Sequence, residues 1–401
     1  MVMPLDGIKI LELNRVAPGS FCGMMLGDMG AEIIKIDTPV RDGGKKSQGP
    51  KADPLWLLSE FTNRNKKSLT LNLKKPEAQK VLHGLIKNTD VLIEGFRPGV
   101  TTRLGADYQT LRTINSRLIY CSLSGFGQTG PYKYRAGHDL NYLAISGLLS
   151  QIGKPCQPPP IPLNVVADYA GATMHGVAGI LLALIARSST GCGQQVDIAY
   201  LDSAFALLSA VPGIRNYFVG SKEPRRGDNV FSGDYAYYCV YQTSDNKWIT
   251  VGCMEPWLWE NFCDALNRPD FKNAKMRTED FENPASDRAK EVKREIEKII
   301  GKKTREEWIA LFEEHDVCVG EVNDFSEAIS DPQLSSRQMV LDLGDQRVEG
   351  GKQPGVAIKL SETPGKIRGR PPEIGEHTDS ILNSLGYTMT ECKKFREIGA
   401  I

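Results

Sequence analysis

Two segments, residues 137–142 and 164–168, carry the side chains best suited to proton transfer. The first reads Gly-His-Asp-Leu-Asn-Tyr, and the second reads Asn-Val-Val-Ala-Asp before a helical run rich in Gly and Ala. Histidine is the side chain that ordinarily changes its charge near neutral pH, which makes His138 a candidate, whereas Asp168 can carry a proton there only if burial or a neighbouring charge raises its pKa. Small residues flank both segments and let a ligand approach the backbone closely. We therefore predict a site in which His138 and Asp168 move a proton.

The composition favours an enzyme that acts on small molecules. The chain has 401 residues, and its 49 Lys and Arg balance 49 Asp and Glu, so a phosphate site must be local and no global field attracts nucleic acid. Its nine cysteines include no CxxC pair, which disfavours a metal site and a disulfide scaffold. The N-terminus lacks signal-peptide features, and the longest apolar run, 177–186, is too short to cross a bilayer. We expect a cytoplasmic protein without nucleic-acid or membrane partners.

Strand and helix patterns alternate along the first 120 residues. Strands are expected at 8–13, 32–36, 68–73, 90–94 and 117–122, and helices at 21–29 and 76–88. Repeated βα units predict an α/β fold with a doubly wound, mostly parallel sheet. Because such sheets bind ligands at the carboxyl ends of their strands, the contacts are expected in the loops after Leu13, Ile36, Glu94 and Leu123.

The pattern changes after two long helical stretches, 167–187 and 200–218. A polar linker at 220–224 precedes a β-hairpin expected over 234–252, and charged helices follow, one of them opening with a capping box at Thr304. A final helix is expected to start near Gly375. We predict a large α/β domain at 1–220, completed by 330–401, and a smaller α+β domain at 225–325.

A nicotinamide-binding fold is disfavoured. The acidic Asp37 at the end of the second strand is half of a dinucleotide fingerprint. The segment 14–23, however, reads Asn-Arg-Val-Ala-Pro-Gly-Ser-Phe-Cys-Gly instead of GxGxxG. Its backbone is therefore not expected to cradle a pyrophosphate in the usual way.

Six segments in a fixed order resemble the family III CoA-transferase and racemase group (CaiB/BaiF superfamily), and within it the α-methylacyl-CoA racemases. These segments are residues 5–13, 27–36, 65–74, 94–99, 124–131 and 375–378. The resemblance implies an interlocked homodimer. It also implies an active site between the large domain of one subunit and the small domain of its partner.

The reaction divides this family. Its transferases use one aspartate as a nucleophile, and its racemases pair that aspartate with a histidine in a Gly-His-Asp-x-Asn-Tyr motif, as at 137–142. The resemblance places His138 and Asp168 in these roles and implies that Glu255, in Gly-Cys-Met-Glu-Pro, helps to hold the histidine. It implies a racemase of lipid metabolism that inverts the α carbon of a 2-methylacyl-CoA thioester. A CoA-transferase with Asp168 as nucleophile and a non-catalytic CoA-binding protein remain alternatives.

The chemistry of inversion gives an independent reason for two proton carriers. A planar enolate must be reprotonated on the face opposite to the one that lost the proton, so one group removes the proton and another returns it. Asp168 starts a helical run, and free backbone N–H groups there are expected to stabilise the enolate oxygen.

The remaining expected contacts hold coenzyme A, which is part of the substrate and not a separate cofactor. Arg97 matches a family arginine that binds phosphate. Arg41 or Lys45 is expected to replace an arginine that the racemases often carry at the position of Thr38. Asp139 is expected to orient its neighbours. The other residues that the resemblance places around coenzyme A are Leu71, Asn72, Leu73, Lys74, Gly137, Asn141 and Tyr142.

Overall fold

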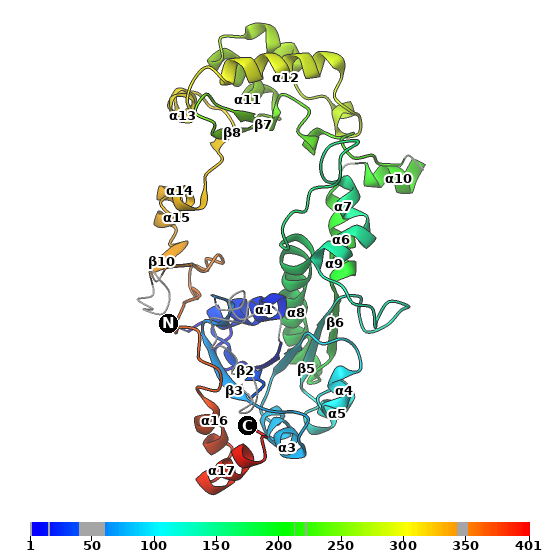
Figure 1. The fold of residues 1–401 in the computed structure, drawn as a ribbon, viewed down its shortest axis with the longest axis vertical. Helices are drawn as coiled ribbons and strands as arrows, with labels where there is room; N and C mark the ends of the chain where they lie inside the picture. The colour runs from blue at the N-terminus through cyan, green and yellow to red at the C-terminus, as the bar shows by residue number, and fades with distance from the viewer. Residues whose placement is uncertain (1, 15–16, 40–60, 212, 221–222, 343–351) are drawn as a thin grey trace. The chain divides into compact units, whose positions relative to one another are not determined.

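The computed structural model describes residues 2–14, 17–39, 61–211, 213–220, 223–342 and 352–401 (Figure 1). The chain forms two compact units. The first comprises Met1–Leu143, Leu163–Ala204 and Pro332–Ile401, and the second comprises Ala144–Pro162 and Phe205–Asp331. The second unit therefore includes 144–162 and 205–220, which the predicted boundaries placed in the large domain.

A parallel sheet forms the centre of the first unit, as predicted, and it has six strands instead of the five expected from the sequence. Its order is β3-β2-β1-β4-β5-β6, and every neighbouring pair is parallel. Its strands are β1(Lys9–Leu13), β2(Glu32–Asp37), β3(Lys66–Thr70), β4(Val91–Glu94), β5(Ile119–Ser124) and β6(Gln195–Ala199). The order reverses between β1 and β4, which makes the carboxyl ends of these two strands the topological switch point of the sheet.

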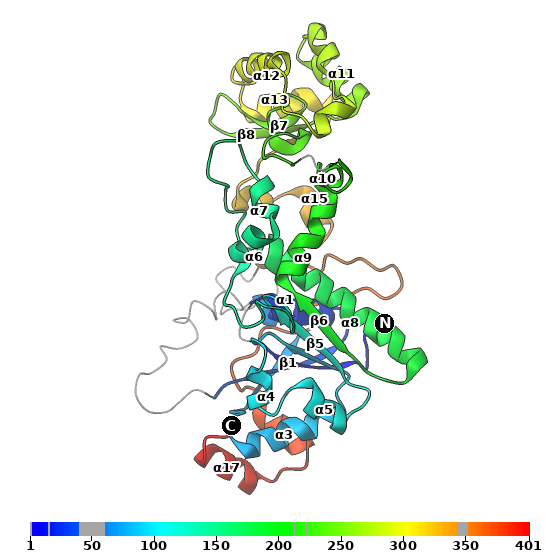
Figure 2. The same cartoon turned by 90° about the vertical axis from the view of Figure 1, so that its right-hand side faces the viewer.

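Helices cover both faces of this sheet (Figures 1 and 2). On one face lie α1(Ala17–Asp28) and α8(Met174–Thr190), and on the other lie α3(Pro76–Ile86), α5(Tyr108–Ile114) and α16(Thr378–Ser384). Leu11, Leu92 and Leu382 belong to the buried core on the α3 side. Each such side chain contributes about 1.5–3 kcal/mol when fully buried. Burial on both faces fits β4 and β5, which are buried along their whole length.

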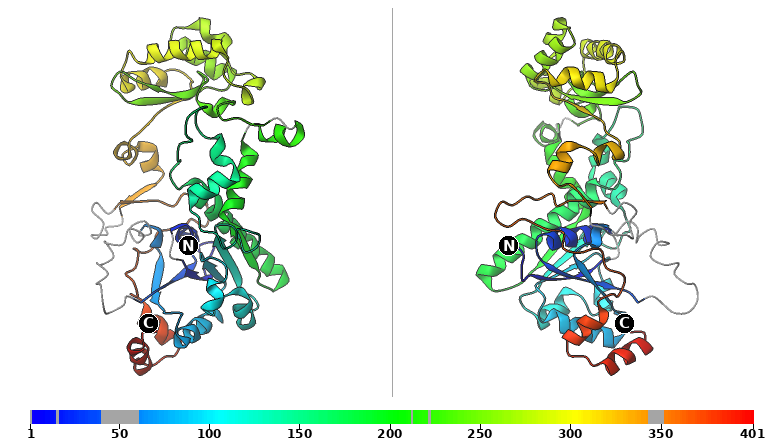
Figure 3. Two further views of the ribbon diagram at one scale, coloured as in Figure 1. Left: turned by 45° about the vertical axis from the view of Figure 1, so that its right-hand side comes forward. Right: turned by 90° about the vertical axis from the view of Figure 1, so that its left-hand side faces the viewer.

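The C-terminal segment completes the first unit. Helices α16 and α17(Met389–Glu397) pack together (Figure 3). The backbone of Asn72 donates to the carbonyl oxygen of Ala400 at 2.8 Å, and the Ala400 and Ile401 side chains lie in the same core as α3.

A buried ion pair fixes where β3 begins. The Lys66 ammonium lies 2.7 Å from a Glu12 carboxylate oxygen, and both side chains are fully buried. Lys66 also donates to the carbonyl and hydroxyl oxygens of Ser20 in α1. These contacts link β1, β3 and α1 and hold Lys66 inside the sheet. Strand β3 therefore starts at Lys66, two residues before the predicted 68–73 strand, and it ends at Thr70.

Residues 166–190 form one helical run, with π-helix η3(Val166–Thr173) leading into α8. Among the described residues this run alone is long and apolar enough to cross a membrane, by length and composition only. It packs on β5 and β6. A Cβ at Gly176 would lie 2.9 Å from Leu123, so the missing side chain allows this close approach. Packing on the sheet accounts for the apolar residues on the buried face of the run, such as Val177 and Ile180.

The second unit contains the predicted β-hairpin. Strands β7(Tyr238–Gln242), β8(Trp248–Gly252) and β9(Val319–Glu321) are antiparallel. Their core includes Trp259, Phe262 and Phe312. The capping box at Thr304 is confirmed. The helix predicted at 200–218 is instead two helices, α9(Tyr200–Leu207) and α10(Ile214–Gly220), with Gly213 at a φ of +85° between them.

The remaining elements are short segments and the helices around the second core. They are η2(Phe61–Asn63), α4(Val100–Arg103), α6(Asp139–Ser146), α7(Leu148–Gln151), η4(Leu208–Ala210), η5(Val230–Ser232), α11(Pro256–Ala265), η6(Pro269–Ala274), η7(Thr278–Phe281), α12(Asp287–Ile300), α13(Arg305–Glu313), α14(Phe325–Ala328), α15(Pro332–Ser336), β10(Val340–Asp342) and β11(Lys352–Pro354).

Candidate active site

The side chain of Asp139 joins the two segments that were predicted to carry the chemistry. One of its carboxylate oxygens accepts the backbone N–H of Ala167 at 2.8 Å and that of Asp168 at 2.9 Å. Asp139 is the first residue of α6 and is 2% exposed. Its neighbour His138 therefore stands at the start of α6, and this start is tied to the start of η3, which carries Asp168.

The prediction that free N–H groups at this helix start stabilise an enolate oxygen is wrong for Ala167 and Asp168. Both groups already donate to Asp139, whose carboxylate is a favourable partner for a helix N-terminus. An enolate oxygen therefore needs a different donor. The sequence pattern could not reveal this, because Asp139 lies far from η3 along the chain.

The environment of Asp168 fits a group that carries a proton near neutral pH. Asp168 is partly buried in η3, and π-helical segments are frequent at functional sites. Burial, and to a smaller extent the negative charge of Asp139, raise the pKa of Asp168 to about 7. The hydroxyl of Thr173 donates to the carbonyl oxygens of Asp168 at 2.9 Å and Pro18 at 3.0 Å. These bonds fix the Asp168 backbone against α1.

His138 is exposed, and its backbone is held by its neighbours. Its N–H donates to the Asn141 side-chain oxygen at 3.0 Å, and its carbonyl accepts the Asn141 N–H at 2.8 Å. The Tyr142 hydroxyl donates to the Gly137 carbonyl at 2.6 Å, and the Tyr142 ring stacks on Tyr200. Gly137, Asn141 and Tyr142 thus support the backbone that presents the imidazole, and their contact with coenzyme A stays a prediction.

Glu255 belongs to the second unit. It is the exposed residue before α11, with Pro256 at the first helical position. Its predicted contact with His138 would join two units and stays a prediction.

A large open cavity lies at the carboxyl end of β4. It has a volume of about 720 Å³ and is lined by Gly95, Phe96, Arg97, Pro98, Gly99, Val100, Arg103 and Tyr134. This volume is in the range of small-molecule sites. Its two exposed guanidinium groups suit phosphate oxygens, and the Tyr134 ring, 65% exposed, suits a flat base.

The sequence analysis named Arg97, which lines this cavity, but did not name Arg103 or Tyr134. A signal for Tyr134 was present, because residues 132–135 alternate aromatic and cationic side chains as Tyr-Lys-Tyr-Arg. Arg103 gave no such signal. Only the turn of α4 brings it to the same cavity as Arg97.

The segment 71–74, which the resemblance places around coenzyme A, follows β3. Leu71 and Leu73 are buried, and the backbone N–H groups of Leu71 and Asn72 already donate to Asp37 and Ala400. Lys74 is exposed. The other predicted cations, Arg41 and Lys45, lie outside the described residues.

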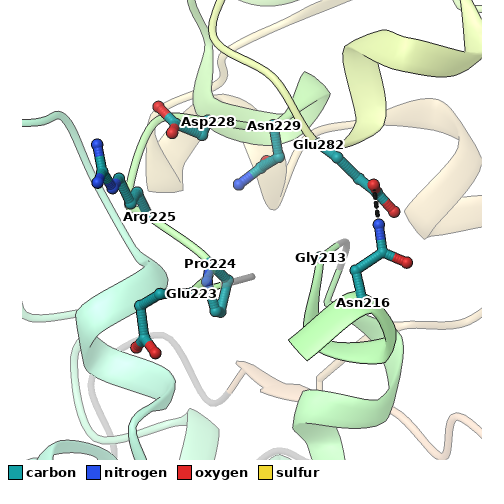
Figure 4. A pocket seen from close by; sticks show the side chains of 8 residues that line it. All are labelled: Gly213, Asn216, Glu223, Pro224, Arg225, Asp228, Asn229 and Glu282. Atoms are coloured by element: carbon teal, nitrogen blue, oxygen red, sulfur yellow. Dashed lines mark hydrogen bonds between the residues drawn. The ribbon is translucent and has the colours of Figure 1, made fainter. Parts of the chain in front are cut away.

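A second cavity, in the second unit, is too small for a substrate (Figure 4). It measures about 20 Å³, which is room for one water. The Asn216 amide donates to the Glu282 carboxylate beside it (Figure 4). The candidate site is in the first unit because His138, Asp168 and the cavity that contains Arg97 all belong to it.

Comparisons with known proteins agree with the predicted resemblance. Residues 5–378 match the model of CoA-transferase family III. The chain is 36% identical to human α-methylacyl-CoA racemase over 391 residues, covering 97% of this chain and 95% of that protein. It is 32% identical to human succinyl-CoA:glutarate CoA-transferase, covering 96% and 86%. A CaiB/BaiF family protein from Brucella suis has a similar structure, with a TM-score of 0.79 at 29% identity, covering 96% of this chain and all of that one. The chain belongs to CoA-transferase family III.

Proposed function

We propose that the protein is an acyl-CoA racemase that inverts the α carbon of 2-methylacyl-CoA thioesters. The observation that carries the proposal is the pair of hydrogen bonds that the backbone N–H groups of Ala167 and Asp168 donate to the Asp139 carboxylate, called the Asp139 clamp below. It ties the His138 segment to a partly buried aspartate whose pKa is raised to about 7. An imidazole and a carboxyl group on neighbouring segments, the carboxyl with a raised pKa, match what inversion through an enolate requires.

In the proposed mechanism, His138 and Asp168 exchange roles with the direction of reaction. For one enantiomer, neutral His138 removes the α proton while protonated Asp168 supplies a proton to the opposite face of the enolate. For the other enantiomer, ionised Asp168 is the base and protonated His138 is the acid. Both directions need one proton shared by the pair, and the raised pKa of Asp168 allows this at neutral pH.

The second candidate is a CoA-transferase with Asp168 as nucleophile. Transferase relatives of similar identity support it. Asp168 acts as a nucleophile only when it is ionised, and a pKa of about 7 leaves about half of it ionised at neutral pH, as one direction of the racemase mechanism also requires. The two candidates therefore differ in their need for His138, which the transferase does not use as a proton carrier.

Incorporation of deuterium from heavy water distinguishes the two functions. The protein should place deuterium at the α carbon of 2-methylacyl-CoA esters, with no second acid present. If CoA instead moves to an added free acid, hydroxylamine traps an acyl group at Asp168, and no α exchange appears, then the transferase proposal is correct.

Arg97→Ala should weaken CoA binding through the loss of a charge-assisted phosphate contact. The expected loss is about 1.5–3 kcal/mol, measured by titration calorimetry with CoA. Arg112→Ala is the control, since Arg112 stacks on Tyr108 and does not line this cavity. An unchanged dissociation constant for Arg97→Ala would remove Arg97 from the site.

We also propose that the protein is an obligate homodimer. One face of α8 supports this, because Met174, Leu181, Leu182 and Ile185 are 37–67% exposed on it. Their spacing places them on a single apolar stripe, a feature typical of surfaces that bind a partner. Sedimentation at micromolar concentration should show a dimer only. A stable monomer with full activity would refute the proposal.

A further inference from the structure

Asn14 is a buried polar residue at the topological switch point of the sheet, and the mechanism above does not use it. It follows β1 directly, as Gly95 follows β4, and the last residues of these strands, Leu13 and Glu94, are paired. The side chain is 4% exposed. In α/β sheets the crevice at this point is where ligands bind.

Both polar atoms of the Asn14 amide lack a hydrogen-bond partner among the described residues. An unpaired buried donor or acceptor normally destabilises a fold, and few occur in native structures. Asn14 has one of each. This cost is typical of residues whose partner is a ligand.

Two glycines make room for this amide. A Cβ at Gly19 would lie 2.5 Å from the Asn14 amide carbon and nitrogen, and a Cβ at Gly95 would lie 2.7 Å from its oxygen. Any other residue at either position would displace the amide. The fold therefore keeps an unpaired amide between α1 and the loop that follows β4.

The neighbours of Asn14 lead to both ends of the proposed substrate. On one side, Gly95 lines the cavity that contains Arg97 and Arg103. On the other side, Gly19 follows Pro18, whose carbonyl accepts from Thr173, and Thr173 also donates to Asp168. Asn14 thus lies between the groups suited to phosphates and the residue that handles the α proton.

We infer that the Asn14 amide binds an amide of the pantetheine arm of coenzyme A, an inference that rests on the proposed acyl-CoA substrate. The pantetheine arm joins the phosphates to the thioester and contains two secondary amides. A secondary amide offers one N–H and one carbonyl. Its N–H can donate to the unpaired oxygen of Asn14, and its carbonyl can accept from the unpaired Asn14 nitrogen. An enolate oxygen, the other possible partner in this region, would satisfy the donor alone. The buried amide must turn out of its place when the ligand binds.

Asn14→Leu tests this role, because leucine has a similar shape and cannot form hydrogen bonds. The probes are desulfo-CoA, which contains the pantetheine arm, and adenosine 3′,5′-bisphosphate, which does not. Calorimetry should show about tenfold weaker binding of desulfo-CoA, the loss expected for one or two hydrogen bonds, and unchanged binding of the bisphosphate. Arg97→Ala should weaken the binding of both ligands.

Stability supplies a second readout that separates a binding role from a structural one. Asn14→Leu removes two unpaired buried atoms, so the midpoint of unfolding without ligand should stay equal or rise. The matched control is Asn115→Leu. The Asn115 amide donates to the carbonyls of Ile86 and Thr89, so this variant should lose stability and keep its affinity for desulfo-CoA.

Three results would overturn the inference. In the first, Asn14→Leu binds desulfo-CoA as tightly as the wild type. In the second, Asn14→Leu weakens the binding of desulfo-CoA and of the bisphosphate equally. In the third, only kcat falls while desulfo-CoA binding is unchanged, which would assign Asn14 to the enolate oxygen. If the wild-type protein binds neither probe, the proposed acyl-CoA function itself fails, which is a distinct outcome.

Discussion

His138→Ala and Asp168→Asn should each reduce inversion of the α carbon by about 10²–10⁴, the usual loss when general acid–base help is removed. Each variant keeps one proton carrier. The retained group should still exchange the α hydrogen of the enantiomer that it faces. The two variants should therefore show mirror-image preferences when R and S thioesters are supplied separately in heavy water.

This experiment measures deuterium incorporation and optical inversion in the same samples. His175→Ala is a close control, since His175 lies on α8, is exposed, and makes a hydrogen bond to the Gly171 carbonyl. It should behave like the wild type. Under the transferase alternative, Asp168→Asn would lose all activity and His138→Ala would lose little. Equal exchange of both enantiomers by both variants would contradict the two-base assignment.

The strands of the first half of the chain could be predicted largely from local sequence patterns. Where these strand predictions were wrong, the error has a physical cause. The apolar strands β1, β2, β4 and β5 were placed within a few residues, because a parallel sheet covered on both faces needs continuous apolar runs. Strand β6 was missed, since Gln195–Ala199 is a half-exposed edge strand that contains Gln and Asp. The start of β3 was misplaced because a buried Lys66–Glu12 pair, which joins distant residues, decides it.

In the candidate site, too, the sequence indicated what depends on residue type and spacing but not what depends on contacts between distant residues. The types and spacing of His138 and Asp168 indicated proton chemistry. The need for a raised Asp168 pKa followed from that chemistry, and the structure bears it out. What the sequence could not reveal were contacts through space. The Asp139 carboxylate binds N–H groups 28 and 29 residues away, and the Asn14 amide has no partner at all among the described residues.

Asp139→Asn should shift the pH dependence of the reaction. The negative charge of Asp139 is a cause of the raised pKa of Asp168, after burial, so its removal should lower that pKa from about 7 toward its usual range. Asp168 must be protonated when it acts as the acid, and this form is lost as pH rises through its pKa. For the enantiomer that His138 deprotonates, the decline of the rate on the basic side of the pH profile should therefore begin at a lower pH in the variant than in the wild type. The acidic limb of the opposite direction should also move to lower pH.

Asp139→Ala should have a larger effect, because it removes the acceptor and not only the charge. The N–H groups of Ala167 and Asp168 would lose their partner, at a cost of about 1–3 kcal/mol in the free energy of unfolding. Chemical denaturation measures this cost. Asp107→Ala is the matched control, since Asp107 caps α5 through Thr110 away from His138 and Asp168. It should lose comparable stability and keep its activity and pH profile.

The two Asp139 variants together separate positioning from electrostatics. An asparagine side-chain oxygen can still accept the two N–H groups, so Asp139→Asn should retain most of the inversion rate at its shifted optimum, whereas Asp139→Ala should lose it across the pH range. If Asp139→Asn leaves the pH profile unchanged, the charge of Asp139 does not act on Asp168. If Asp139→Ala keeps full activity, the clamp does not position the two proton carriers, and the observation that carries the racemase proposal loses its force.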